Sequence, residues 1–226
     1  MANSNLYSVG EQILSRLESK NAQREQVLGR SRHLVQHAAK AIRAVHRREW
    51  EVADAILADA AVLLEEMSSA ADGHSDLMSA GYTLDAQKEF AEAHLTRALV
   101  RGEELPSPEE LGVGDAAWLN GLGEAGGELR RVALDMIRRG EIADAETVLD
   151  QMQEIYVFLS TVDFPDAITR GIKRTNDMVR GVTERTRGDL TVAARQEELK
   201  AALDRFEVRM AERDSAQAEV SGAGPA

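Results

Sequence analysis

The sequence predicts an all-α fold, and composition and periodicity both support this. Proline accounts for 4 of 226 residues and aromatic residues for 4%, whereas Ala, Leu, Arg and Glu, which favour helices, are abundant. Apolar residues recur at the three- and four-residue spacing of a helix, and no segment shows the alternation of a strand. We therefore expect a seven-helix bundle built from long amphipathic helices.

Glycine, proline and capping residues mark the ends of these helices. We expect helices over 5–47, 49–69, 75–101, 115–139, 142–161, from the DFPD segment to 187, and 190–213. Gly188 is expected to end the sixth helix and Asp189 to cap the seventh. The resulting organisation is one all-α domain, 1–214, followed by a disordered tail, 215–226, of small and polar residues.

The chain lacks features of secreted and membrane proteins. It has no cysteine, its N-terminal residues lack the pattern of a signal peptide, and no apolar stretch approaches membrane-spanning length. We therefore expect a cytoplasmic protein with no membrane partner.

The expected helices are long for a chain of this size. An apolar ridge of the first helix is expected to face the core and consists of Ile13, Leu17, Leu28, Val35, Ile42 and Val45. Long amphipathic helices joined by short loops often bury a second face in a partner. We therefore expect a homo-oligomer.

Charge is segregated along the chain. The formal net charge is −12, yet the segment 20–48 holds eight basic residues and one acidic residue. Within it, Arg32, Lys40, Arg43 and Arg47 recur at a spacing that keeps them on one side of a helix. Such a basic stripe can follow a phosphate backbone without reading sequence. The alternative is a solvated face paired with the acidic second helix, and spacing alone favours that alternative.

His33 and His37 form an i, i+4 pair that could bind a metal ion. No carboxylate motif accompanies them on that helix, so an extension of the polar or nucleic-acid-binding face is preferred to a zinc site. His37 is therefore grouped with the basic stripe.

Carboxylates form stripes on three expected helices. They are Asp85, Glu89 and Glu92; Glu124 and Glu128; and Glu146, Asp150 and Glu154. If the stripes converge, their oxygen atoms would suit Mg²⁺ or Mn²⁺. If they do not, they are solvent-facing acids, which are common on helices, and spacing alone favours this second interpretation. Gly123 and Gly127 would let another helix approach the one that carries Glu124 and Glu128.

Two long segments resemble the translin family. They are WLNGLGEAGGELRRVALDMIRRGEIADAETVLDQMQEIYVFL at 118–159 and FPDAITRGIKRTNDMVRGVTERTRGDLT at 164–191. The EFAEA segment at 89–93 is similar to the Glu-x-x-Glu-Ala segment of translin-associated factor X. The resemblance covers about 20–206. It implies a seven-helix subunit of a hollow, barrel-like octamer or related assembly that holds single-stranded RNA or DNA in its cavity.

The resemblance leaves two functions open. Translin is mainly a binding subunit, whereas translin-associated factor X is a Mg²⁺-dependent endoribonuclease whose acids form a Glu-x-x-Glu and an Asp-x-x-x-Glu pair. Glu89 and Glu92 match the first pair, but Ala143 and Thr147 stand at the positions of the second. This departure puts catalysis in question, unless other acids replace the missing pair.

Three further acids could fill this role. Asp150 and Glu154 have the same spacing as the missing pair and lie one to two turns further along, and Glu128 is at a position where the family shares an acid. The catalytic set predicted for an endoribonuclease is therefore Glu89, Glu92, Glu128 and Asp150, with Glu154 as a further Mg²⁺ or Mn²⁺ ligand. Nucleic acid would bind Arg32, His37, Lys40, Arg43 and Arg47. The alternatives are a non-catalytic binding scaffold and an assembly module whose partner supplies the activity.

Overall fold

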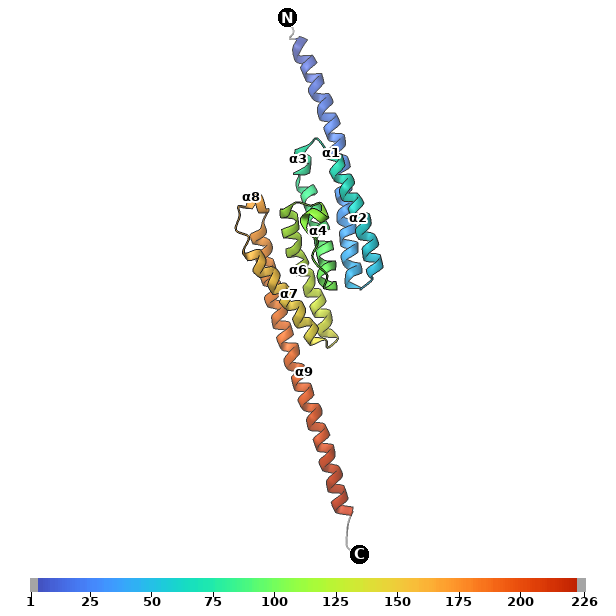
Figure 1. Ribbon diagram of the computed structural model, residues 1–226, viewed down its shortest axis with the longest axis vertical. Helices are drawn as coiled ribbons and strands as arrows, with labels where there is room; N and C mark the ends of the chain where they lie inside the picture. Colours follow the sequence, from blue (N-terminus) through green and yellow to red (C-terminus); the bar gives the residue numbers. More distant parts are fainter. Residues whose placement is uncertain (1–3, 223–226) are drawn as a thin grey trace.

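The computed structural model describes the backbone of residues 4–222 and the side chains of 5–214, and this part of the chain is helical without any strand. Six long helices and three single turns follow one another (Figure 1). They are α1 Ser4–His46, α2 Trp50–Ala70, α3 Ser75–Met78, α4 Gly81–Arg101, α5 Pro108–Leu111, α6 Asp115–Arg138, α7 Ile142–Ser160, α8 Asp166–Thr169 and α9 Ile172–Gly222. The predicted all-α fold is confirmed.

The long helices pack side by side in a sequence of neighbours. α1 packs on α2 and on α4, α4 packs on α6, and α6 packs on both α7 and α9. The largest fully buried side chains include Phe90 and Leu95 of α4, Leu129 of α6 and Met152 of α7. One continuous apolar core thus runs from α1 to α9 and fixes α4 and α6 at its centre.

Glycines allow α6 to approach its neighbours closely. A Cβ atom at Gly121 would lie 2.9 Å from two backbone atoms of α4, the amide nitrogen of Glu92 and the carbonyl oxygen of Lys88. A Cβ atom at Gly123 would lie 2.3 Å from the Thr175 side chain of α9. The expected close approach at Gly123 is therefore present, and Gly121 adds a second approach, toward the backbone of α4.

The predicted helix end at Gly188 is wrong, because α9 passes through this residue. Arg130 of α6 hydrogen-bonds to Thr186 and to Asp189, at 3.0 and 2.8 Å, and Leu190 is buried. These contacts hold the helix on both sides of the glycine. They outweigh the cost of placing glycine inside a helix, which is about 1 kcal/mol relative to alanine. Asp189 therefore forms an ion pair with α6 and does not cap a new helix.

Two other expected boundaries differ in detail. The expected third helix is divided into α3 and α4, since the chain is extended at Ala80 and the buried Thr83 hydroxyl donates to the Leu77 carbonyl oxygen. Residues 215–222 of the expected tail belong to α9, and 223–226 lie outside the described residues.

Both ends of the molecule extend beyond the packed body (Figure 1). The first turns of α1 and the last turns of α9 project at opposite ends of the long axis. Ile13 and Leu17, which were expected in the core, are 43% and 56% exposed, because in the described part of the chain the first turns of α1 project beyond the packed body. Among the described residues, no helix is long and apolar enough to cross a membrane.

Candidate metal centre and nucleic-acid interface

Three carboxylates from α4 and α6 converge on one point. Glu89, Glu92 and Glu124 each place one oxygen atom within 4.8 Å of the other two, and we call them the acid cluster. Glu89 and Glu92 are three residues apart and so share a face of α4, next to Phe90, which anchors the helix in the core. The carboxylates are thus held on rigid, packed helices.

Gly121 explains why Glu124 reaches the acid cluster. Glu124 is one turn after Gly121 on α6, and the glycine lies against the backbone of Lys88 and Glu92. The missing side chain brings the two helix axes together at this level. Glu124 therefore faces the carboxylates of α4.

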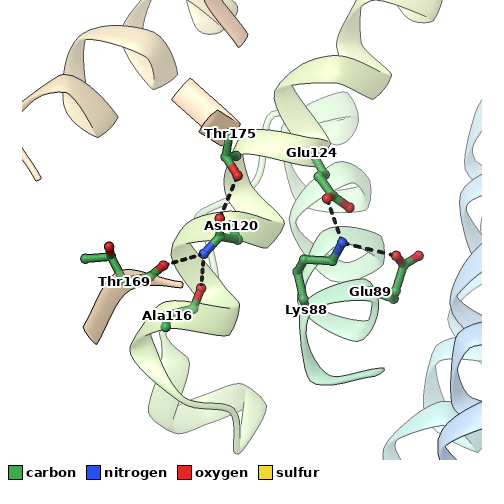
Figure 2. A network of polar contacts seen from close by, with 7 residues as sticks. All are labelled: Lys88, Glu89, Ala116, Asn120, Glu124, Thr169 and Thr175. Carbon is green, nitrogen blue, oxygen red and sulfur yellow. Dashed lines mark hydrogen bonds and ion pairs between the residues drawn. The ribbon is translucent and has the colours of Figure 1, made fainter. Parts of the chain in front are cut away.

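Lys88 contacts two members of the acid cluster. Its ammonium nitrogen lies 2.6 Å from Glu124 Oε1 and 3.4 Å from Glu89 Oε1 (Figure 2). Burial alone would lower the pKa of Lys88, but these ion pairs raise it above its ordinary value. Lys88 therefore stays charged and neutralises part of the acid cluster.

Burial and mutual repulsion oppose ionisation of the acid cluster. Burial, followed by repulsion from Glu124 and Glu89, raises the pKa of Glu92 to about 9. Burial also raises the pKa of Glu89, although Lys88 opposes the shift. With no other cation bound, Glu92 is protonated at neutral pH.

Glu128 lies beside the acid cluster but is paired with α1. Its Oε2 is 2.5 Å from Nε2 of His46, whose side chain is almost fully buried at the end of α1. This hydrogen bond lowers the pKa of Glu128, against the effect of burial. Glu128 also adds to the negative field at Glu92, so it borders the cluster without being one of its three converging members.

The structure does not bring Asp150 and Glu154 to this place. Both are exposed on α7, and among the described residues the converging carboxylates are those of Glu89, Glu92 and Glu124. Glu154 instead lines a separate, largely apolar pocket with Trp118 and Phe158. Within one chain, these two acids therefore do not replace the pair that the family pattern lacks.

The basic stripe lies on the surface of α1. Arg32, Lys40 and Arg43 are exposed and form no ion pair with the described residues. Arg47 is bound through two nitrogen atoms to Glu49, at 2.8 and 2.7 Å, and half-buried His37 contacts the carbonyl oxygen of His33. The stripe thus keeps three cations available, and His46 connects the end of the same helix to Glu128.

Sequence reasoning missed three participants. Glu124 belongs to one of the three acidic stripes considered in the sequence but not to the predicted catalytic or metal-binding set, and neither Lys88 nor His46 was assigned a role. Lys88 immediately precedes Glu89, so the sequence contained a cation beside the acids. The contact between His46 and Glu128 spans 82 positions, and no local spacing indicates it.

The acid cluster fits a hard divalent cation. Its donors are carboxylate oxygens, which Mg²⁺ and Mn²⁺ prefer, and they already lie close enough to share one ion. Burial, and after it repulsion between the carboxylates, raises the pKa values of Glu92 and Glu89, and a bound cation would oppose both effects.

Comparisons with known proteins agree with this architecture. No family model matches the chain. A protein of Methanocaldococcus jannaschii called Uncharacterized protein MJ0175 is 26% identical over 203 residues, which are 88% of this chain and 89% of that protein. AfC3PO, solved alone and as a complex with duplex RNA, is 32% identical with TM-scores of 0.73 and 0.71. The aligned part is 81% of this chain and 96% or 95% of AfC3PO. Apo-NeC3PO, 19% identical over 85% of this chain and 99% of its own, has the same fold with a TM-score of 0.72.

Proposed function

This chain belongs to the translin family, which includes C3PO, and from that premise we propose that it binds single-stranded RNA or DNA and acts as a metal-dependent endoribonuclease. The proposed catalytic activity is supported by the convergence of Glu89, Glu92 and Glu124, each of which places a carboxylate oxygen within 4.8 Å of the other two. The complex of AfC3PO with duplex RNA supports the nucleic-acid-binding part.

The acid cluster would hold Mg²⁺ or Mn²⁺. Such an ion supplies an activated water molecule and positive charge for a phosphoryl transition state. Lys88 stands close enough to Glu89 and Glu124 to contribute further charge to a phosphate bound there. Beside the acid cluster, Glu128 is bound to His46, and this pair would help to orient the substrate strand or a proton acceptor.

The basic stripe would hold the strand. Arg32, Lys40 and Arg43 are exposed and unpaired within the described chain, as phosphate contacts require. On α1, Arg43 lies less than one turn from His46, which touches Glu128. A strand that follows the stripe would therefore reach the region of the acid cluster.

A homo-oligomer, an octamer or a related closed assembly, would enclose this site. The projecting ends of α1 and α9 expose apolar side chains in rows that no helix among the described residues covers. The exposed members are Leu6, Tyr7, Leu14 and Leu17 of α1, and Leu199, Leu203, Phe206 and Met210 of α9. Such rows are typical of faces buried against another copy.

The test is a cleavage assay with labelled single-stranded RNA, in Mg²⁺ or in EDTA. The variant Glu89→Gln/Glu92→Gln removes two members of the acid cluster without changing their shape. Glu51→Gln/Glu65→Gln is the matched control, because it makes the same two substitutions at exposed positions on α2. We expect cleavage by the wild type and the control in Mg²⁺ alone, and none by the cluster variant. Duplex RNA in a parallel assay tests the strand preference.

The second candidate function is a binding scaffold without catalysis. Lys88 favours it, because this ammonium group already balances Glu124 and Glu89, and because Asp150 and Glu154 lie elsewhere. Equal RNA binding by wild type and cluster variant, without cleavage by either, would establish the scaffold. Activity that appears only with a second type of subunit would identify an assembly module.

A further inference from the structure

A pocket of about 380 Å³ adjoins the acid cluster between α4, α6 and the start of α9. Lys88 and Glu124 line this pocket and are also in contact at the acid cluster, whereas Glu89 and Glu92 do not line it. We call it the α9 pocket. Its volume is within the range of small-ligand sites, and its wall is shared with the candidate metal centre.

Two arginines of the α9 pocket have no partner in the described chain. Arg170 and Arg174 both line it, both are exposed, and neither guanidinium forms a hydrogen bond or ion pair with the described residues. Elsewhere in the body, Arg97 and Arg130 are paired with Asp54 and Asp189. The pocket thus concentrates unpaired positive charge in a protein with a net charge of −12.

A buried hydrogen-bond network fixes the turn that carries these arginines. The Asn120 amide nitrogen donates to the Thr169 carbonyl oxygen at 2.8 Å, and its oxygen accepts from the Thr175 hydroxyl at 2.6 Å (Figure 2). Asn120 is buried, and these bonds tie the end of α8 and the first turn of α9 to α6. Arg170 itself has a left-handed backbone, φ 52°, within this turn. The guanidinium groups therefore start from a preorganised backbone.

The remaining lining residues suit a nucleoside. Leu84 and Met178 form apolar wall on which a base or sugar can pack. Asp85, exposed at the pocket, offers an acceptor for a ribose hydroxyl. Two unpaired arginines, an apolar wall and a hydroxyl acceptor together suit one nucleotide.

We propose that the α9 pocket binds one nucleotide of the RNA strand, with its phosphate on Arg170 and Arg174. Because Lys88 and Glu124 separate this pocket from the other two carboxylates, a strand anchored here presents its next phosphodiester to the acid cluster. This proposal rests on the proposed function and names the subsite that would position the substrate. Guanidinium groups bind phosphate through two hydrogen bonds each, which suits this role.

The experiment compares Arg170→Ala/Arg174→Ala with the control Lys173→Ala/Arg180→Ala. The control removes two exposed cations of α9 that do not line the pocket. Each protein is titrated with uridine 5′-monophosphate and, separately, with single-stranded RNA, and the thermal unfolding midpoint checks folding. We expect the pocket variant to lose at least about tenfold in affinity for both ligands, while the control loses less than about threefold.

The two titrations separate the two proposals. Equal binding of uridine monophosphate by the pocket variant and the wild type would refute the proposal that the α9 pocket binds a nucleotide. Arginine-dependent binding of the mononucleotide without any RNA binding would keep the pocket as a free-nucleotide site and refute the proposed function. RNA binding that depends on the basic stripe but not on Arg170 and Arg174 would overturn the pocket and keep the proposed function.

Discussion

The α6 and α7 helices carry acidic pairs of the same spacing with different outcomes. Glu124 and Glu128 on α6, and Asp150 and Glu154 on α7, are both i, i+4 pairs. Glu124 joins Glu89 and Glu92 of α4, and Glu128 meets His46 of α1, whereas both acids of α7 are exposed. The spacing of acids along a helix therefore does not make a site. A site forms where two helices approach closely enough for their acids to converge.

The largest expected difference between the two pairs is in catalysis. Glu124→Gln removes a carboxylate from the acid cluster and leaves Lys88 without its shortest ion pair. We expect RNA cleavage to fall by about 100-fold or more, as when a metal ligand or its support is lost. Asp150→Asn/Glu154→Gln should retain activity within about twofold. Single-turnover cleavage at several Mg²⁺ concentrations measures both effects.

A reversed result would change the assignment of the site. If the α7 variant lost cleavage and Glu124→Gln kept it, the active acids would come from α7, and a second subunit would have to complete them. Glu128→Gln should lower RNA cleavage by less than Glu124→Gln does and by more than the α7 variant does, because Glu128 borders the acid cluster and binds His46.

A second comparison tests the close approach itself. Gly121→Ala would place a Cβ atom 2.9 Å from backbone atoms of Lys88 and Glu92, so α4 and α6 must separate. We expect a loss of about 1–3 kcal/mol in the free energy of unfolding, together with weaker Mg²⁺ binding. Gly188→Ala is the control, since its Cβ atom would meet nothing within 4 Å in the middle of α9. This change should stabilise the protein by about 0.5–1 kcal/mol.

Urea unfolding at one fixed protein concentration measures both glycine variants, because assembly contributes to apparent stability. Equal stability of Gly121→Ala and the wild type would show that α4 and α6 can separate without cost. The convergence of the acids would then not depend on this glycine.

The fold class could be predicted from sequence because composition and periodicity act along the whole chain. The bounds of α1, α2, α6 and α7 agree with the expected ranges to within one or two residues. The prediction of a helix end at Gly188 was wrong because α9 is held there by contacts of Arg130 with Thr186 and Asp189, which join segments distant in the sequence. Local rules for glycine cannot include such contacts.

The candidate site was predicted in part for the same reason. Glu89 and Glu92 could be found by local spacing and by family resemblance. Choosing Glu124 over Asp150 required the relative placement of α4, α6 and α7, which depends on the glycines of α6. The roles of Lys88 and His46 became visible only with the ion pairs between helices.

Glu92 is buried in the acid cluster, whereas Glu154 is exposed on α7, and the burial of Glu92 predicts that the stability of the protein depends on pH. The pKa of Glu92 rises from 4.5 in the unfolded chain to about 9, so the folded protein binds more protons between these values. The stability that Glu92 contributes is fully present below pH 4.5 and is lost as the pH rises to about 9. The free energy of unfolding should fall by at most about 1.4 kcal/mol per pH unit in this range. Urea unfolding in EDTA between pH 5.5 and 8.5 measures this slope.

Variants identify the group responsible for the slope. Glu92→Gln should flatten the slope, and Glu154→Gln, which removes an exposed carboxylate from α7, is the control. Saturating Mg²⁺ should also flatten it in the wild type, because the cation takes the place of the proton. An unchanged slope in Glu92→Gln would show that another group controls it.

The smallest expected effect is on RNA affinity and concerns two arginines of the basic stripe, Arg43 and Arg47, which differ in their ion-pair partners. Arg43 has no ion pair within the described chain, whereas Arg47 is held by Glu49 through two hydrogen bonds. Arg43→Ala should lower RNA affinity by about threefold to tenfold and reduce the salt slope by about 0.7, the value for one phosphate contact on a single strand. Arg47→Ala should have less effect, because binding phosphate would first require breaking the pair with Glu49.

Glu49→Gln sharpens this last test, because it releases Arg47 without removing it. We expect this variant to bind RNA more tightly than the wild type and with a steeper salt dependence. Fluorescence anisotropy over a series of salt concentrations gives both quantities for the three variants. Equal losses from Arg43→Ala and Arg47→Ala, with no gain from Glu49→Gln, would mean that nucleic acid outcompetes the pair with Glu49. The availability of a charge in the free protein would then not determine its part in binding.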